Sequence, residues 1–182
     1  MTKQITSLCV FCGARPGNNP AYLAAAEALG AAIAKNGIRL VYGAGDVGIM
    51  GAVARTALAG GAKALGVIPT HLVPREAPEG LIGDRIITEN MHERKKVMFM
   101  NSDAIAVLPG GAGSLDEFFE VLTWAQLGLH SKPIFLVDID GYWQPLTGLI
   151  DHVIDQGFAD QSLLGLFQIV ASVDELIERL SA

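Results

Sequence analysis

Short apolar runs alternate with longer amphipathic stretches along most of the chain. Continuous apolar runs predict strands covered on both faces of a sheet; they lie at 7–13, 38–43, 63–69, 103–111 and 132–138, with shorter ones at 85–90 and 167–170. Amphipathic stretches predict helices at 20–37, 47–61, 91–102, from 114 to about 127, at 142–156 and at 172–181. Strands separated by helices of this length pair in parallel through right-handed crossovers. We therefore expect an α/β fold: a doubly wound, mostly parallel sheet with helices on both faces.

Three of the predicted strands end in glycine-rich loops, which read "CGARPGN" (12–18), "YGAGDVG" (42–48) and "LPGGAGS" (108–114). In doubly wound sheets, ligands bind beyond the carboxyl ends of the strands. We therefore expect a binding site at this edge, close to the glycines of these loops: Gly13, Gly43, Gly45, Gly110, Gly111 and Gly113. Helix starts near Val47 and Ser114 would offer backbone N–H groups to an anion there.

The loop at 43–48 matches the pattern G-x-G-x-x-G, which is typical of dinucleotide sites. However, it follows the second predicted strand instead of the first, and the next strand ends without the acid that would hold a ribose. These two departures disfavour NAD and FAD. The chain also lacks the G-x-x-x-x-G-K-[ST] pattern of P-loop nucleoside triphosphatases. The remaining interpretation is a smaller ligand that carries a phosphate.

Composition narrows the class of protein. Apolar residues make up 51% of the 182 residues and charged residues 18%, which predicts one globular domain over residues 1–182. A net charge of −6 argues against a nucleic-acid partner and against a polybasic membrane patch. The sequence has no signal-peptide pattern and no apolar run long enough to span a bilayer, so we expect a cytoplasmic protein.

Cysteine and histidine positions do not predict a metal site. Cys9 and Cys12 form a C-x-x-C pattern, but it lies in a predicted strand, where side chains three residues apart point to opposite faces. We expect buried structural thiols there instead of a redox or metal pair. The histidines show no metal-ligand spacing: His71, His92, His130 and His152.

Two short motifs carry candidate chemistry. In "MHERKK" (91–96), helical spacing puts Met91, Arg94 and Lys95 on one face, although a solvated basic face has the same pattern. In "SLDE" (114–117), Glu117 is either a carboxylate directed at a ligand or the glutamate of a capping box that begins at Ser114. Both interpretations stay open on these residues alone.

Taken together, "MHERKK" and "PGGAGSLDE" closely resemble the paired signatures of the Lonely Guy family of cytokinin-activating phosphoribohydrolases. The segments "YGAGDVGIMGAVA" and "WAQLGLHSKPIFLVDIDGYWQPL" are similar to further parts of that family. The resemblance covers nearly the whole chain. It implies a Rossmann-like fold, a homodimer, and hydrolysis of the N-glycosidic bond of nucleoside 5′-monophosphates without a metal or cofactor. Older descriptions of the family as lysine decarboxylases would require pyridoxal phosphate, which no residue pattern here supports.

The resemblance also implies roles for individual residues. Arg94 and Glu117 match the catalytic positions, and Lys95 matches a companion lysine. The remaining substrate-binding positions are Met91, Gly13, Gly43, Gly45, Gly110, Gly111, Gly113, Ser114 and, as a neighbour of Glu117, Glu120. Ser114 replaces the usual threonine of the phosphate loop and keeps its hydroxyl. In the first loop, Ala14 and Arg15 stand where the family often has two serines, so Arg15 would compensate for a missing hydroxyl.

Two other functions are compatible with the same motifs. One is a general nucleosidase for nucleoside 5′-monophosphates, which would differ only in its base pocket. The other is a non-catalytic carrier of a nucleotide or a phosphorylated cofactor. Because a carrier needs no carboxylate beside the sugar, Arg94 and Glu117 together favour an enzyme. The glutamate would then face the cationic centre that forms at C1′ and orient the attacking water.

Overall fold

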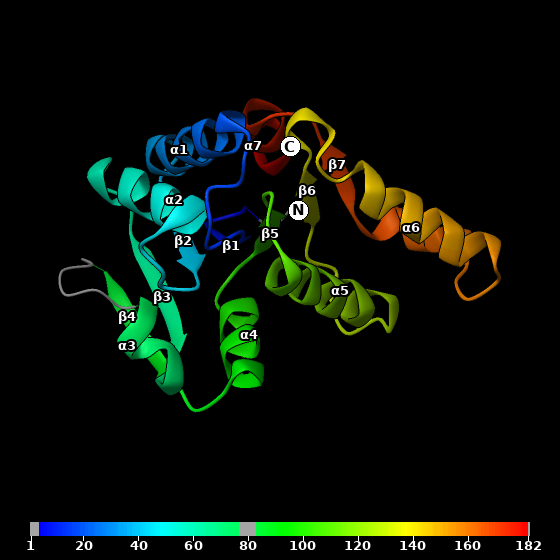
Figure 1. Ribbon diagram of the computed structural model, residues 1–182, viewed down its shortest axis with the longest axis horizontal. Helices are drawn as coiled ribbons and strands as arrows, with labels where there is room; N and C mark the ends of the chain where they lie inside the picture. The colour runs from blue at the N-terminus through cyan, green and yellow to red at the C-terminus, as the bar shows by residue number, and fades with distance from the viewer. Residues whose placement is uncertain (1–3, 77–82, 182) are drawn as a thin grey trace.

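A computed structural model describes residues 4–76 and 83–181 of the chain. Its centre is a seven-stranded, entirely parallel sheet with the order β4-β3-β2-β1-β5-β6-β7 (Figure 1). The strands are β1 (Ser7–Phe11), β2 (Arg39–Tyr42), β3 (Ala64–Pro69), β4 (Asp84–Thr88), β5 (Ala104–Val107), β6 (Ile134–Val137) and β7 (Gln168–Val170). The α/β fold class expected from the sequence is confirmed.

Helices cover both faces of this sheet (Figure 1). On one face lie α1 (Pro20–Lys35), α2 (Gly48–Ala59) and α7 (Val173–Ser181); on the other lie α4 (Met91–Met100), α5 (Ala112–Gln126) and α6 (Gln144–Asp155). Each face has its own apolar cluster, because neighbouring side chains on a strand alternate between them. Leu8 and Val10 of β1 belong to the first cluster, and Cys9 and Phe11 belong to the second.

The cysteine prediction is confirmed by this alternation. Cys9 and Cys12 are both buried and free, and they belong to the clusters on opposite faces of the sheet. Burial is the main cause that raises the pKa of both thiols, so both stay protonated at neutral pH. Neither is a nucleophile in this state.

The chain runs outward from β1 to β4 on one side, then returns to the centre and runs outward from β5 to β7 on the other. The order of the strands therefore reverses between β1 and β5. At such a point the loops that leave the two strands separate, and a crevice opens between them. The loops at 12–18 and 108–111 flank this crevice, as the glycine pattern predicts.

The element boundaries differ from the sequence prediction in two places that affect the site. Strand β5 ends at Val107, so Leu108–Gly111 form a turn instead of continuing the strand, and α5 begins at Ala112, two residues before Ser114. The excursion at 70–84 contains a 3₁₀ turn (Thr70–Leu72) and the short helix α3 (Val73–Glu76), and its part at 77–82 lies outside the described residues. Two further 3₁₀ turns lie at Ile139–Gly141 and Gln161–Leu166.

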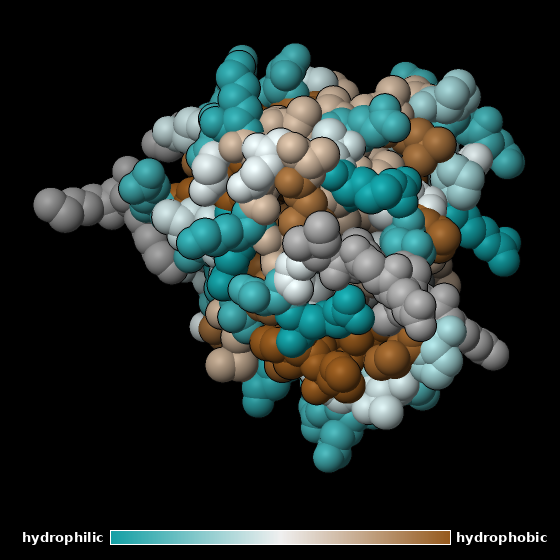
Figure 2. All heavy atoms as spheres, turned by 90° about the vertical axis from the view of Figure 1, so that its left-hand side faces the viewer, coloured by the Kyte–Doolittle hydropathy of each residue, from teal (hydrophilic) through white to brown (hydrophobic). Residues whose placement is uncertain are grey.

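The edge strand β4 is largely uncovered. The Ile87 side chain is 61% exposed there, and apolar side chains gather at the lower edge of this side of the molecule, toward α3 and α4 (Figure 2). No helix within residues 4–76 and 83–181 has the length and apolar character needed to cross a membrane.

Candidate active site

A cavity of about 490 Å³ opens where the strand order reverses. It is lined by the loops after β1 and β5, by the first turns of α2, α4 and α5, and by two tyrosines. Its lining includes the predicted residues Gly13, Met91, Arg94, Gly110, Gly111, Gly113, Ser114 and Glu117. Among the described residues, the predicted positions that do not line it are Gly43, Gly45, Lys95 and Glu120.

The start of α5 presents uncapped N–H groups to this cavity. Gly111 is the N-cap residue, and no side chain accepts a hydrogen bond there. The first intrahelical bond at this end runs from Leu115 N to Gly111 O, which leaves the N–H groups of Ala112, Gly113 and Ser114 without backbone partners in the helix. Such an end attracts an anion, because the unpaired N–H groups and the helix dipole both favour negative charge.

Gly111 and Gly113 leave open space at this helix start. A Cβ atom built at either position would have no protein atom within 4 Å, and both residues line the cavity. Gly110 differs, since a Cβ there would lie 2.0 Å from Ser114 Oγ. Gly110 is therefore required by close packing against Ser114, whereas the other two glycines keep room for a ligand.

The capping box that the sequence left open is not formed. Ser114 is the third residue of α5 instead of its N-cap, and it is buried. Glu117 consequently lies one turn inside the helix, where it is buried and is one of the residues that line the cavity. The glutamate is thus free for a role toward a ligand.

Two aromatic residues after β6 support the turn at 108–111. Tyr142 Oη donates a hydrogen bond to Gly110 O at 2.5 Å, and Trp143 Nε1 donates one to Val107 O at 3.2 Å. The Tyr142 ring lines the cavity beside Tyr22 of α1, with 5.3 Å between the ring centroids. Both tyrosines escaped the sequence analysis, although each follows a loop at the carboxyl edge of the sheet, where a ligand was expected.

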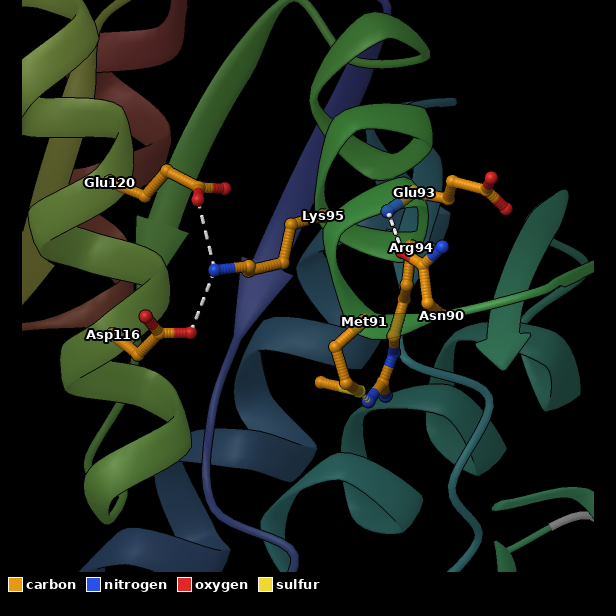
Figure 3. Close-up of polar contacts among 7 residues, drawn as sticks. All are labelled: Asn90, Met91, Glu93, Arg94, Lys95, Asp116 and Glu120. Atoms are coloured by element: carbon orange, nitrogen blue, oxygen red, sulfur yellow. Dashed lines mark hydrogen bonds and ion pairs between the residues drawn. The ribbon is translucent and has the colours of Figure 1, made fainter. Parts of the chain in front are cut away.

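Arg94 is buried, with only 5% of its surface exposed. Asn90 caps the N-terminus of α4, the helix that carries Arg94: its Oδ1 accepts a hydrogen bond from Glu93 N at 3.0 Å (Figure 3). Arg94 Nε donates to Val67 O at 3.0 Å and Nη2 donates to Gly43 O at 2.7 Å. These bonds hold the guanidinium against β2 and β3 while the side chain lines the cavity.

The glycines of the loop at 43–48 serve this packing. A Cβ at Gly43 would lie 1.9 Å from Arg94 Nη2, so only glycine lets the guanidinium reach the Gly43 carbonyl. Gly48 has φ +61° and would bring a Cβ within 2.5 Å of Ala14 O in the first loop. Gly45 N donates to Met50 Sδ at 3.2 Å. The G-x-G-x-x-G pattern therefore has a structural explanation that needs no dinucleotide.

The first loop is held against the other two. Gly13 N donates to Pro109 O at 3.1 Å, and Gly13 O accepts a hydrogen bond from Met50 N at 3.2 Å. Arg15, an exposed cation, lines the same cavity as the open start of α5. Its positive charge favours an anion in this cavity.

Burial has the largest effect on the pKa of Glu117. Desolvation raises its pKa from 4.5 to about 7; the positive charge of Arg94 opposes this shift, and the negative charge of Asp116 adds to it. Both protonation states of Glu117 are therefore populated at neutral pH. A carboxyl group with this pKa suits general acid or base catalysis.

Lys95 does not share the cavity face of Arg94. Consecutive residues on a helix point about 100° apart, and Lys95 turns toward α5, where its Nζ lies 2.9 Å from Asp116 Oδ2 and 2.9 Å from Glu120 Oε2 (Figure 3). Burial alone would lower the pKa of Lys95, but the hydrogen bonds to the two carboxylates raise it, so Lys95 is charged.

Metal-binding geometry is absent from the described part of the chain, since no three His, Cys, Asp or Glu side chains are grouped to hold an ion.

Comparison with known proteins identifies the family. Residues 50–180 match a family model described as "Possible lysine decarboxylase". The chain is 41% identical over 177 residues to the probable cytokinin riboside 5′-monophosphate phosphoribohydrolase LOG4 of Oryza sativa subsp. japonica. This alignment covers 97% of this chain and 77% of that protein. It is 40% identical over 173 residues to LOG1 of Arabidopsis thaliana, a cytokinin riboside 5′-monophosphate phosphoribohydrolase, with 95% and 81% covered. The chain belongs to the Lonely Guy family.

Among solved structures, the molybdenum cofactor binding protein from Rippkaea orientalis is similar, with a TM-score of 0.73, 22% sequence identity, and coverage of 99% of this chain and 97% of that one. At this identity the similarity extends to the fold alone. The Lonely Guy signatures instead fall on the cavity. Arg94 and Glu117 line it from α4 and α5, and Gly110, Gly111 and Gly113 surround the start of α5.

Proposed function

We propose that this chain hydrolyses the N-glycosidic bond of adenosine 5′-monophosphates, with N6-modified forms among its substrates, to give the free base and ribose 5-phosphate. The observation that carries the proposal is a single cavity that joins an open helix start, a fixed arginine and the buried carboxyl group of Glu117. Relatives about 40% identical to the chain are named as cytokinin riboside 5′-monophosphate phosphoribohydrolases, which supports the same reaction.

The substrate would lie across the cavity with its phosphate at the start of α5. The N–H groups of residues 112–114 would donate to the phosphate oxygens, and Arg15 would add positive charge. Glu117 follows one turn later on the same helix, so its carboxyl group would face the ribose instead of the phosphate. The anion site and the acid behind it would therefore meet different parts of one ligand.

The reaction would proceed with Glu117 ionised. The bond between C1′ and the base nitrogen breaks with its electron pair leaving on the base, and C1′ becomes cationic. The carboxylate stabilises this charge and accepts a proton from the water that attacks C1′, while the departing base takes up a proton from solvent; Glu117 then returns its proton to solvent. Arg94, with two N–H groups held by backbone carbonyls, would present its remaining N–H groups to the ribose or phosphate oxygens.

The apolar part of the cavity lining supports an apolar group on the base. Its side chains come from three elements: Ile49, Met50, Leu72 and Met91. Thioether side chains adapt to ligands of irregular shape. We therefore expect an apolar N6 substituent to bind at least as well as the unmodified amino group.

The test compares free base and ribose 5-phosphate released from AMP and from N6-isopentenyl-AMP by the wild-type protein and by Glu117→Gln. We expect release from both nucleotides, and a loss of about 10²–10⁴ in rate for the variant, with nucleotide binding retained. Asp151→Asn, an exposed carboxylate on α6, is the matched control and should match the wild type. Release from AMP alone would favour a general nucleosidase, and binding without release would favour a carrier.

The homodimer and the cytoplasmic location that the resemblance and the sequence imply remain predictions. The uncovered apolar side chains toward α3, α4 and β4 support a homodimer (Figure 2). Sedimentation velocity on the purified chain tests it, because a monomer at micromolar concentration would contradict it.

A further inference from the structure

The ion-pair cluster of Lys95, Asp116 and Glu120 joins the two helices that carry the candidate catalytic residues. Lys95 follows Arg94 on α4, and Asp116 precedes Glu117 on α5. The contacts are both 2.9 Å long, and the Lys95 side chain is only 6% exposed (Figure 3). The contacts of Lys95 with Asp116 and Glu120 therefore set the distance between α4, which bears Arg94, and α5, which bears Glu117.

We propose that Lys95 is a positioning residue, which fixes α4 against α5 through Asp116 and Glu120 and thereby holds Arg94 and Glu117 in their working arrangement. The inference rests on the proposed function for the roles of Arg94 and Glu117. It differs from direct substrate binding by Lys95, because Lys95 does not line the cavity and its ammonium group is occupied by two carboxylates.

Each end of this arrangement is anchored elsewhere. Arg94 is held to the sheet by its bonds to Val67 O and Gly43 O, so α4 cannot rotate without breaking them. On α5, Asp116 and Glu120 are four residues apart and meet the same ammonium group, so Lys95 fixes the rotation of α5 as well as its distance. Glu117 follows Asp116 on α5 and points about 100° away from it, so its direction is set by the same rotation of the helix.

The role of Lys95 can be tested through the pKa of Glu117, because this pKa depends on the charges of its neighbours and not on packing alone. On α4, Arg94 and Lys95 are positive; on α5, Asp116 and Glu120 are negative. The nearest titratable groups of β1 and its loop, Cys9 and Cys12, are neutral thiols. The two positive and two negative charges of these neighbours cancel, so Glu117 is one further carboxyl group beside a neutral cluster. Removal of the Lys95 charge leaves two negative neighbours against the single positive charge of Arg94, so we expect the pKa of Glu117 to rise.

The experiment measures the pKa of Glu117 by NMR titration of ¹³C-labelled glutamate carboxyls, assigned with Glu117→Gln, together with the pH profile of AMP hydrolysis. The variants are Lys95→Met, which keeps the length and apolar stem of the side chain, and Lys96→Met, the matched control. Lys96 is an exposed lysine on the same helix. We expect Lys95→Met to raise the pKa of Glu117 and to lower kcat by about 10²-fold, the effect of a misplaced reacting group, whereas Lys96→Met changes neither.

A double variant, Lys95→Met with Glu120→Gln, separates position from charge. It leaves the positive charge of Arg94 against the negative charge of Asp116, so it restores the charge balance around Glu117 but not the link between the helices. We expect its Glu117 pKa to return toward that of the wild type while kcat stays low. Should Lys95→Met fail to fold, Asp116→Asn with Glu120→Gln removes the same link from α5 and is expected to lower kcat in the same way.

Three results would overturn the proposal: a Glu117 pKa and kcat in Lys95→Met equal to those of Lys96→Met, full recovery of kcat in Lys95→Met with Glu120→Gln, or wild-type kcat in Asp116→Asn with Glu120→Gln. The NMR titration needs no turnover. If the wild-type protein releases no base, the proposed function fails on its own, and the pKa comparison between Lys95→Met and Lys96→Met still decides whether Lys95 acts on Glu117.

Discussion

Gly113 offers a substitution that should stabilise the protein and weaken its function at the same time. The residue lies in the first turn of α5 with no positive φ, and a Cβ there would meet no protein atom within 4 Å. Alanine restricts the unfolded chain more than glycine and favours the helix, which is worth about 0.5–1 kcal/mol. For a chain of this size, 1 kcal/mol raises Tm by roughly 2–4 °C.

The same methyl group would occupy the space beside the open N–H groups of α5, because Gly113 lines the cavity. A phosphate pushed away from this helix start loses at least one charge-assisted hydrogen bond, worth about 1.5–3 kcal/mol. This loss corresponds to a rise of roughly 10- to 100-fold in the Kd for AMP. Binding is measured by calorimetry with Glu117→Gln as the background, so that the nucleotide is not consumed.

Gly148→Ala is the matched control. Gly148 lies inside α6, is exposed, and likewise has no protein atom within 4 Å of an added Cβ, but it does not line the cavity. Both variants should melt at a higher temperature than the wild type, and only Gly113→Ala should lose affinity for AMP. Equal AMP affinity in the two variants would refute the assignment of the phosphate to the start of α5.

Two further predictions concern Arg94 and Glu117. Gly43→Ala should displace the Arg94 guanidinium and break its bonds to Gly43 O and Val67 O. We expect the free energy of unfolding, measured in urea, to fall by roughly 3 kcal/mol and hydrolysis to be lost. A variant as stable as the wild type would contradict the packing argument. Because the pKa of Glu117 is about 7 in the folded chain against 4.5 when exposed, its ionisation opposes folding. The contribution is absent below about pH 4.5 and grows as the pH rises through about 7, to roughly 3 kcal/mol. The stability of Glu117→Gln relative to the wild type should therefore increase between pH 5 and pH 8, and a constant difference in urea unfolding would contradict a buried carboxyl group.

The α/β class and the location of the site follow from the sequence alone. The alternation of apolar runs and amphipathic stretches is a local property of the chain, and crossover geometry leaves few ways to arrange it. For the same reason the loops with Gly13 and Gly110 had to meet at one edge of the sheet. The opposite directions of Cys9 and Cys12 also followed from strand geometry.

What each glycine and each charged side chain does was decided only by tertiary structure. Gly43 belongs to a dinucleotide pattern in the sequence, yet it makes room for Arg94, a residue 51 positions away. Lys95 and Arg94 were both expected on the face of Met91 because they follow it by four and three residues, but Lys95 pairs with the carboxylates of α5 instead. Glu117 had the sequence of a cap, and it became a buried cavity residue because α5 starts two residues earlier. Periodicity reports which side of an element is apolar; the partner of a polar side chain depends on packing between distant segments, which no local pattern contains.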